Sequence, residues 1–323
     1  MTRDERVQIA RKRLVRVLEA NVVCLARTLE QKIADAGPNP QRIDPHILTE
    51  VRSALGREGV ILSENILGAP WYFLARTPYE EVKKRLAVLT PIHARMQKPG
   101  FSKRLGQTME IAVYRALKAE KRFKTLGGFP DLDDHDDSTP YKKKEPPSFV
   151  SGQSMEGEAD FMLLTRKGQI AAVEVKNVRE WLYTNREEVR AIITKALAVD
   201  AVPVLIARRI HFVTFRVLNP CGVIIHQIYN QMFPAADQAL AEKAKHKDLL
   251  GFHDIRTGNQ PDNRLTKFIS GNLPDLLDDA REKFEANRDL LEAFSSQEMP
   301  YKEFAARVRR RSNETNEDHD WEL

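Results

Sequence analysis

The stretch GEADFMLLTRKGQIAAVEVK, residues 157–176, decides the fold of this 323-residue chain. Two apolar runs flank a turn at 166–168, a pattern that predicts an antiparallel β-hairpin. Because residues two apart on a strand share a face, Glu174 and Lys176 point to one side and the valines between them point into the core. The turn brings Asp160 across from Glu174. Two carboxylates and one ammonium are therefore expected to converge at one end of a sheet.

Ionisable side chains within such an apolar strand are costly unless they are paired or bind a metal. Two carboxylates suit a hard cation such as Mg²⁺, with Mn²⁺ as a substitute. Next to such a cation, Lys176 could orient a water molecule and offset negative charge on a phosphate. The competing interpretation is a surface strand that carries an ordinary Glu/Lys pair.

These residues resemble the motif of the PD-(D/E)XK, or restriction-endonuclease-like, nuclease superfamily, which has an acid on one strand and acid-x-Lys on the next. Asp160 matches the first acid, with Ala159 where the motif's name has proline. Glu174-Val175-Lys176 matches the second half. Many members have a further glutamate on the preceding helix, and Glu110 occupies that place. The resemblance covers roughly residues 100–230.

The resemblance implies an α/β fold in which helices flank a central mixed sheet, and hydrolysis of phosphodiester bonds with Mg²⁺ or Mn²⁺. The catalytic residues that it implies are Glu110, Asp160, Glu174 and Lys176. The implied metal ligands are Glu110, Asp160, Glu174 and Val175. Because cutting both strands of a duplex usually needs two active sites, a homodimer is plausible on mechanism.

A basic segment precedes the hairpin: residues 97–126 hold eight Lys and Arg against two acids. Lysine and arginine beside an acidic metal site suit a nucleic-acid backbone, because they replace its condensed counterions. The alternative is a solvated helix face. The candidate nucleic-acid contacts, some of them on a helix predicted over 185–199, are Lys103, Arg104, Arg186, Arg190 and Lys195.

The amino-terminal part has the pattern of a winged helix-turn-helix. Helices are predicted over 4–30 and 44–57, and a hairpin over 60–74. In that arrangement the helix at 44–57 is the recognition helix and the hairpin is the wing. Winged helices also serve as protein–protein modules, so the pattern leaves both roles open.

The rest of the chain completes the predicted organisation. Residues 127–150 are rich in Gly, Pro and charge and are expected to be an exposed loop, with the acidic run 131–137 solvated rather than calcium-binding. A strand is expected over 210–217. The predicted domains are a winged helix at 1–77, a helical linker at 78–99, the nuclease core at 100–235 and a helical, charged carboxy-terminal region at 236–323.

The composition and charge of the chain indicate its class of partner and its cellular location. The net charge of +5 and the pI near 9.1 permit a polyanionic partner. No apolar run is long enough to cross a bilayer and the amino terminus is charged, so we expect a cytoplasmic protein without a membrane partner. Cys24 and Cys221 are far apart in sequence and are expected to be buried free thiols rather than zinc ligands.

The sequence thus predicts a Mg²⁺-dependent DNA endonuclease, with restriction or antiphage defence as the best-fitting role and defence-system proteins as possible partners. Within the enzyme class the alternative is a repair or recombination nuclease of the junction-resolvase kind. A different class is a DNA-binding regulator in which the nuclease fold has no activity. A third possibility is that the substrate is RNA, which a winged helix and a nuclease core do not exclude.

Overall fold

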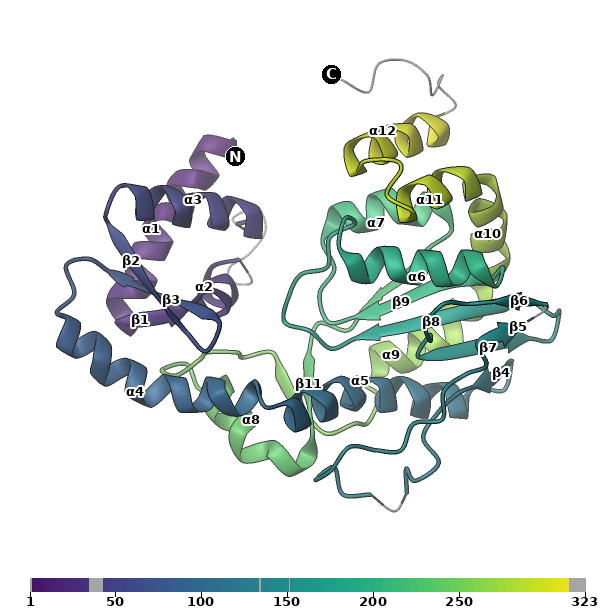
Figure 1. Cartoon of the computed structure of the whole chain (residues 1–323), viewed down its shortest axis with the longest axis horizontal. Helices are drawn as coiled ribbons and strands as arrows, with labels where there is room; N and C mark the ends of the chain where they lie inside the picture. The colour runs from purple at the N-terminus through teal and green to yellow at the C-terminus, as the bar shows by residue number, and fades with distance from the viewer. Residues whose placement is uncertain (1, 35–42, 134, 151, 314–323) are drawn as a thin grey trace. The chain divides into compact units, whose positions relative to one another are not determined.

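The computed structural model describes residues 2–34, 43–133, 135–150 and 152–313 (Figure 1). The chain forms two compact units, the first from Met1–Ser102 and Asp237–Thr257, the second from Lys103–Ala236 and Gly258–Leu323. This division differs from the expected boundaries at 77, 99 and 235. The carboxy-terminal residues from Gly258 onward belong to the same unit as the hairpin, because their apolar side chains join its two cores.

The first unit is a small helical domain around a three-stranded sheet. The sheet has the order β1-β3-β2, and both pairings are antiparallel. Leu14, Leu18, Leu48 and Leu55 are among its buried core residues. Its elements are α1 (Arg3–Asn21), β1 (Val23–Leu25), α2 (Ala26–Ile33), α3 (Pro45–Arg57), β2 (Ile61–Ile66), β3 (Ala69–Leu74), α4 (Tyr79–Met96), α8 (Gln238–Lys245) and β12 (Ile255–Thr257).

The expectation of one helix over 4–30 is wrong. The chain leaves the helix at Val22, whose φ is 68°, and Val23–Leu25 pairs with β3 as a fully buried strand. Burial of three consecutive apolar residues outweighs the helical spacing that the sequence suggested. The predicted helix over 44–57 and the hairpin that follows it are present as α3, β2 and β3.

The second unit is an α/β domain, and its central sheet is mixed, as the sequence predicted. The sheet has five strands. Its sheet has the order β10-β9-β8-β7-β4. Its elements are α5 (Pro99–Ala119, most of which lies in this unit), β4 (Phe123–Leu126), β5 (Phe149–Val150), β6 (Gln153–Ser154), β7 (Phe161–Thr165), β8 (Ile170–Lys176), α6 (Glu187–Ala198), β9 (Val202–Ala207), α7 (Phe212–Leu218), η1 (Asn219–Cys221), β10 (Ile224–Gln227), β11 (Gln231–Phe233), α9 (Asn263–Lys267), η3 (Phe268–Asn272), α10 (Leu273–Ala286), α11 (Arg288–Ser295) and α12 (Tyr301–Ser312).

Strand direction places the polar residues of β8 at one end of this sheet. β7 and β8 form the predicted antiparallel hairpin, whereas β8, β9 and β10 run parallel. The carboxyl ends of these three strands therefore meet at a common edge. Lys176 is in register with Ala207 of β9, and Ala207 is in register with Gln227 of β10.

Helices cover both faces of the sheet (Figure 1). On one face α5 packs against Val173 and Val175, together with η3 and the first turns of α10. On the other face α6 packs against Ala172 and Leu205, together with α7, α11 and α12. Alternating β8 residues thus enter two different cores, which fixes the register of the strand.

Two other expectations about this unit are wrong. Residues 212–218 form α7 rather than a strand, because the His211 ring accepts a hydrogen bond from the Val213 amide and caps a helix whose inner face holds Thr214, Val217 and Leu218. The segment 127–150 is packed rather than solvated. Gly128 and Lys144 exchange backbone hydrogen bonds of 2.8 Å, and Phe129 and Tyr141 are buried.

The acidic run 131–137 is likewise not simply a solvated charge run. Asp134 lies outside the described residues. The Asp137 carboxylate is buried and accepts hydrogen bonds from the Tyr141 hydroxyl, the Asn259 amide and the Ala235 backbone amide. Asp137 therefore holds the loop against the rest of the unit.

Cys24 and Cys221 are buried free thiols, as predicted. No helix among the described residues has both the length and the apolar character that crossing a membrane requires.

We predict that Gly222→Ala strongly destabilises the second unit. Gly222 has a φ of 76°, and a Cβ atom there would overlap the Ala280 carbonyl oxygen and lie 2.5 Å from the Phe284 backbone nitrogen. Backbone strain of about 1–2 kcal/mol adds to the overlap with α10. We expect a loss of about 3 kcal/mol or more in chemical denaturation.

Gly168→Ala is the matched control. Gly168 has a φ of 82°, but nothing lies within 4 Å of its would-be Cβ atom. Only the backbone strain remains, so a loss of about 1 kcal/mol is expected. Equal losses for the two variants would contradict the assigned packing of Gly222 on α10.

Candidate active site

The hairpin places Asp160 and Glu174 side by side. Asp160 directly precedes β7, and its backbone amide donates to the Val173 carbonyl over 3.0 Å. Because Phe161 pairs with Val173, Asp160 lies opposite Glu174 and shares its face of the sheet. The Oδ2 atom of Asp160 also accepts a 2.7 Å hydrogen bond from the Val175 backbone amide. The geometry that the sequence predicted for these residues is present.

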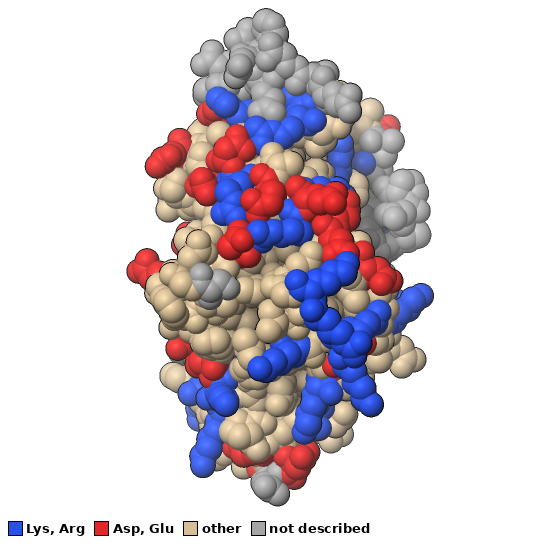
Figure 2. Space-filling view, turned by 90° about the vertical axis from the view of Figure 1, so that its right-hand side faces the viewer, with Lys and Arg blue, Asp and Glu red and all other residues tan. Residues whose placement is uncertain are grey.

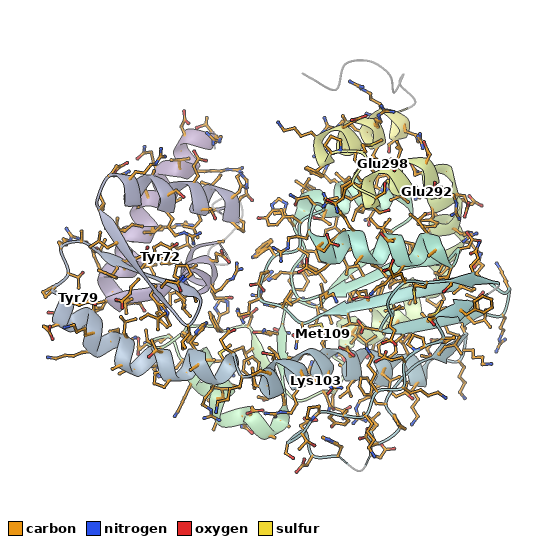
Figure 3. The ribbon with its side chains drawn as sticks, in the orientation of Figure 1. Tyr72, Tyr79, Lys103, Met109, Glu292 and Glu298 are labelled. Carbon is orange, nitrogen blue, oxygen red and sulfur yellow. The ribbon has the colours of Figure 1, made fainter. Side chains whose placement is uncertain are left out.

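Glu110 approaches the same place from α5. It follows Met109, which is labelled on this helix in Figure 3 and is fully buried in the core. Glu110 and Asp160 are linked by one ammonium: the Nζ atom of Lys143 lies 3.0 Å from Glu110 Oε2 and 2.6 Å from Asp160 Oδ1. The same ammonium lies 3.5 Å from Glu145 Oε2. Lys143 and Glu145 belong to the segment that was expected to be an exposed loop.

Glu174 is neutralised by two lysines. Its Oε1 atom lies 2.5 Å from the Lys176 ammonium and its Oε2 atom 3.2 Å from the Lys195 ammonium of α6. Lys195 also donates to the Glu158 carbonyl over 2.6 Å. Only 7% of the Glu174 side chain is exposed, so without these partners its charge would be strongly destabilising.

The pKa values reflect this crowding. Burial and, to a smaller extent, the Asp160 carboxylate raise the pKa of Glu110 to about 7, although Lys143 opposes the shift. Burial disfavours the charged form of Lys143, but Asp160 and Glu110 outweigh it and raise the pKa of this lysine. Burial likewise opposes the charge on Lys176, and Glu174 raises its pKa. Near neutral pH, Glu110 is therefore partly protonated.

The carboxylates of the site are of the chemical type that binds a hard divalent cation, but their side chains are not arranged to hold one together. Carboxylate oxygens are the ligands that Mg²⁺ prefers. Glu110 Oε2 is buried, and the partner that the structure gives it is the Lys143 ammonium at 3.0 Å. Across the described ranges, however, no three His, Cys, Asp or Glu side chains are grouped so that they could hold a metal together. The Lys143 ammonium instead stands between Glu110 and Asp160.

Val175, the fourth expected ligand, has a side chain buried in the core on the α5 side of the sheet. A valine side chain has no donor atom, and its backbone amide is bonded to Asp160. Only its carbonyl oxygen could contact a cation.

The candidate nucleic-acid residues lie in different environments. Lys195 is at the site itself. Arg104 donates to the Asp137 carbonyl over 2.9 Å, and Lys103 is exposed on α5 (Figure 3). Arg186 pairs with Glu188, and the Arg190 guanidinium lies 5.2 Å from the Phe294 ring centre. Arg190 thus helps to dock α11.

Charged side chains on the visible face of Figure 2 are not evenly spread. Lysine and arginine dominate its lower part, whereas acidic and basic groups alternate in its upper part. Part of the basic character of residues 97–126 is used internally: Arg115 donates to the Asn259 side chain over 3.2 Å, and Arg122 pairs with Glu120. The exposed cations that remain on the segment include Lys103, Lys118, Lys121 and Lys124.

No protein-family model, no curated protein and no solved structure matches this chain. The chemistry of the site therefore has to be inferred from its own residues.

We predict that Lys143→Met lowers stability in a pH-dependent way. Without this ammonium, two largely buried carboxylates lose their shared partner, which costs about 3 kcal/mol where both are ionised. Glu110 is protonated below its pKa of about 7, so the loss should be smaller at pH 5 than at pH 8. Chemical denaturation in the presence of a chelator measures both values.

Lys144→Met is the control, because Lys144 is the exposed neighbour of Lys143. A change of less than about 0.5 kcal/mol is expected at either pH. If Lys143→Met behaved in the same way, the ion pairs with Glu110 and Asp160 would not be stabilising.

Proposed function

We propose that this protein is a metal-dependent nuclease that cleaves DNA as an endonuclease. The observation that carries the proposal is that Asp160, Glu174 and Lys176 lie at one end of the β7–β8 hairpin, where Lys143 joins Asp160 to Glu110 of α5. Apart from Lys143, these are the residues that resemble the PD-(D/E)XK motif. A β-hairpin that buries acids this deeply in an apolar sheet needs a chemical reason, and binding a cation is one.

The roles of the residues follow from their positions. Glu110, Asp160 and Glu174, with the carbonyl of Val175, would hold Mg²⁺ or Mn²⁺. A bound divalent cation would polarise the phosphodiester and lower the pKa of a water molecule. The Lys176 ammonium would offset charge on the phosphate oxygens, and Lys195 would keep Glu174 ionised and oriented.

The partners and setting are part of the same proposal. Duplex DNA would dock on the first unit, with α3 as the recognition helix and the β2–β3 hairpin as the wing. A homodimer would supply the second active site for the other strand. We place the enzyme in the cytoplasm and in restriction or antiphage defence, with repair or recombination as the other role for the same chemistry.

A second candidate function is a DNA-binding regulator that does not cleave. One observation favours it: the Lys143 ammonium bridges Glu110 and Asp160. A protein that uses these acids only to anchor its loop would need nothing more. The two candidates differ in whether a divalent cation can take the place of this ammonium.

We expect Mg²⁺- or Mn²⁺-dependent cleavage when the protein is incubated with supercoiled plasmid, linear duplex, single-stranded DNA and RNA, and none with chelator. Asp160→Asn and Lys176→Met should each lower the cleavage rate by about 100-fold or more, because they remove charge at the reacting phosphate.

Asp278→Asn and Lys167→Met are the matched controls, since this 2.6 Å ion pair joins the hairpin turn to α10 at the surface. They should cut like the unaltered protein. Cleavage that survives both site substitutions would overturn the catalytic assignment. DNA binding without cleavage of any of the four substrates would favour the regulator.

We further predict that Lys143→Met binds Mn²⁺ more tightly than the unaltered protein, by about tenfold, as measured by isothermal titration calorimetry. A cation would no longer have to displace an ammonium from Glu110 and Asp160, and one ion pair at this distance is worth about 1.4 kcal/mol or more in a buried setting. Lys144→Met should leave the affinity unchanged. If Lys143→Met did not change the affinity for Mn²⁺, Glu110 and Asp160 would not be the metal ligands.

A further inference from the structure

A pocket of about 390 Å³ lies between the end of β10 and the α9–η3 segment, apart from the carboxylates described above. This volume falls within the range of ligand sites in proteins. Its lining combines rings with cations and includes His226, Gln227, Tyr229, Arg264, Lys267 and Phe268.

The inner wall of the pocket is a pair of stacked rings. The His226 and Phe268 ring centres lie 4.1 Å apart and their planes differ by 8°. Burial lowers the pKa of His226 to about 4, so its ring is neutral at physiological pH. The Nε2 atom of His226 is buried and has no hydrogen-bond partner among the described residues. This wall is therefore a flat, uncharged surface rather than an anion site.

Tyr229 also lines the pocket and lies beside two guanidinium groups. The Arg209 and Arg264 guanidinium carbons are 5.1 Å and 4.9 Å from the Tyr229 ring centre. Tyr229 has a φ of 74°, a conformation that costs a tyrosine about 1–3 kcal/mol, yet 41% of the residue is exposed. Its backbone amide is held by the Arg208 carbonyl at 2.9 Å. The chain thus maintains strain in order to present an aromatic ring to solvent.

Two of the cations that line the pocket are exposed. Arg264 and Lys267 form no ion pair with any residue that the structure describes. The nearest acid in sequence, Asp262, accepts a 2.8 Å hydrogen bond from the Leu265 amide and caps α9. Two cations beside planar rings suit a ligand that is both aromatic and anionic.

The pocket also lies at the same sheet edge as the candidate active site. Gln227, Ala207 and Lys176 are in register across β10, β9 and β8. Two strand spacings separate the backbones of β10 and β8 by about 10 Å. A nucleic-acid strand at Lys176 could therefore extend to β10 within a few nucleotides.

We propose that this pocket binds one unpaired nucleotide, with its base against the rings of Tyr229 and His226 and its phosphate at Arg264 and Lys267. Base stacking on aromatic side chains is worth about 1–3 kcal/mol per base and tolerates any sequence. That the nucleotide belongs to a substrate strand rests on the nuclease function proposed above. A free nucleotide offers the same chemistry, and the test below separates the two sources.

Fluorescence anisotropy of a short labelled oligothymidylate, in the presence of a chelator, tests the proposal without any cleavage. Arg264→Ala and Tyr229→Asn should each weaken binding by about tenfold. Asparagine is chosen because it tolerates a positive φ, which keeps the backbone of residue 229 intact. Unlabelled dTMP and unlabelled oligothymidylate serve as competitors. Displacement by dTMP identifies a free-nucleotide site, and displacement only by oligonucleotide identifies a strand site.

Arg216→Ala is the matched control, because Arg216 is also exposed and also lies over an aromatic ring, that of Phe212, but does not line the pocket. It should bind the oligonucleotide as the unaltered protein does. If Arg264→Ala and Tyr229→Asn bound the oligonucleotide no more weakly than this control, the pocket would not be a nucleotide site. If the protein bound the oligonucleotide as expected but cleaved no substrate, the nucleotide pocket would be supported and the nuclease function would be rejected.

Discussion

The constraint on which the second unit depends is the burial of acids at the end of an apolar sheet. The Glu174 and Asp160 side chains are only 7% and 13% exposed, and Glu110 is 14% exposed. Charges in such surroundings must be paired, because the loss of hydration outweighs any gain from packing. Their partners, Lys143, Lys176 and Lys195, come from the 127–150 segment, from β8 and from α6. Charge compensation thus ties together parts of the chain that the apolar cores hold in separate layers.

Much of this arrangement could be predicted from the sequence, for a physical reason. The hairpin is local: the turn at 166–168 and the period of two place Asp160 opposite Glu174 without knowledge of any distant residue. α6 follows in the same way from its apolar stripe. Glu110 could be placed only through the resemblance, since nothing local to α5 says which of its faces meets the hairpin. A central mixed sheet was predicted, whereas the number and order of its strands are known only from the structure.

The position of Lys143 between Glu110 and Asp160 could not be predicted from the sequence. Lys143 stands in a run of three lysines with no periodicity, within a segment rich in Gly, Pro and acids. Its position depends on the Gly128–Lys144 backbone pair and on Asp137, which anchors the loop to Ala235 and Asn259. These contacts join residues far apart in sequence. The error at 210–217 has the same origin, because the His211 cap and the burial of Thr214 override a β-branched composition that favours a strand.

The charges around Lys143 bear on how a cation and a phosphate would enter the site. When ionised, Glu110, Glu145, Asp160 and Glu174 carry four negative charges, against three positive charges on Lys143, Lys176 and Lys195, which leaves one negative charge. A divalent cation that displaced the Lys143 ammonium from Glu110 and Asp160 but left it beside the site would turn this into one positive charge, and a single phosphodiester would then restore neutrality. Either ligand alone leaves a net charge in a poorly hydrated place, where it is costly. If the site is catalytic, metal and substrate are therefore expected to bind more tightly together than separately. The alternative route to balance is protonation of Glu110, whose raised pKa makes it the carboxyl most easily neutralised when no metal is bound.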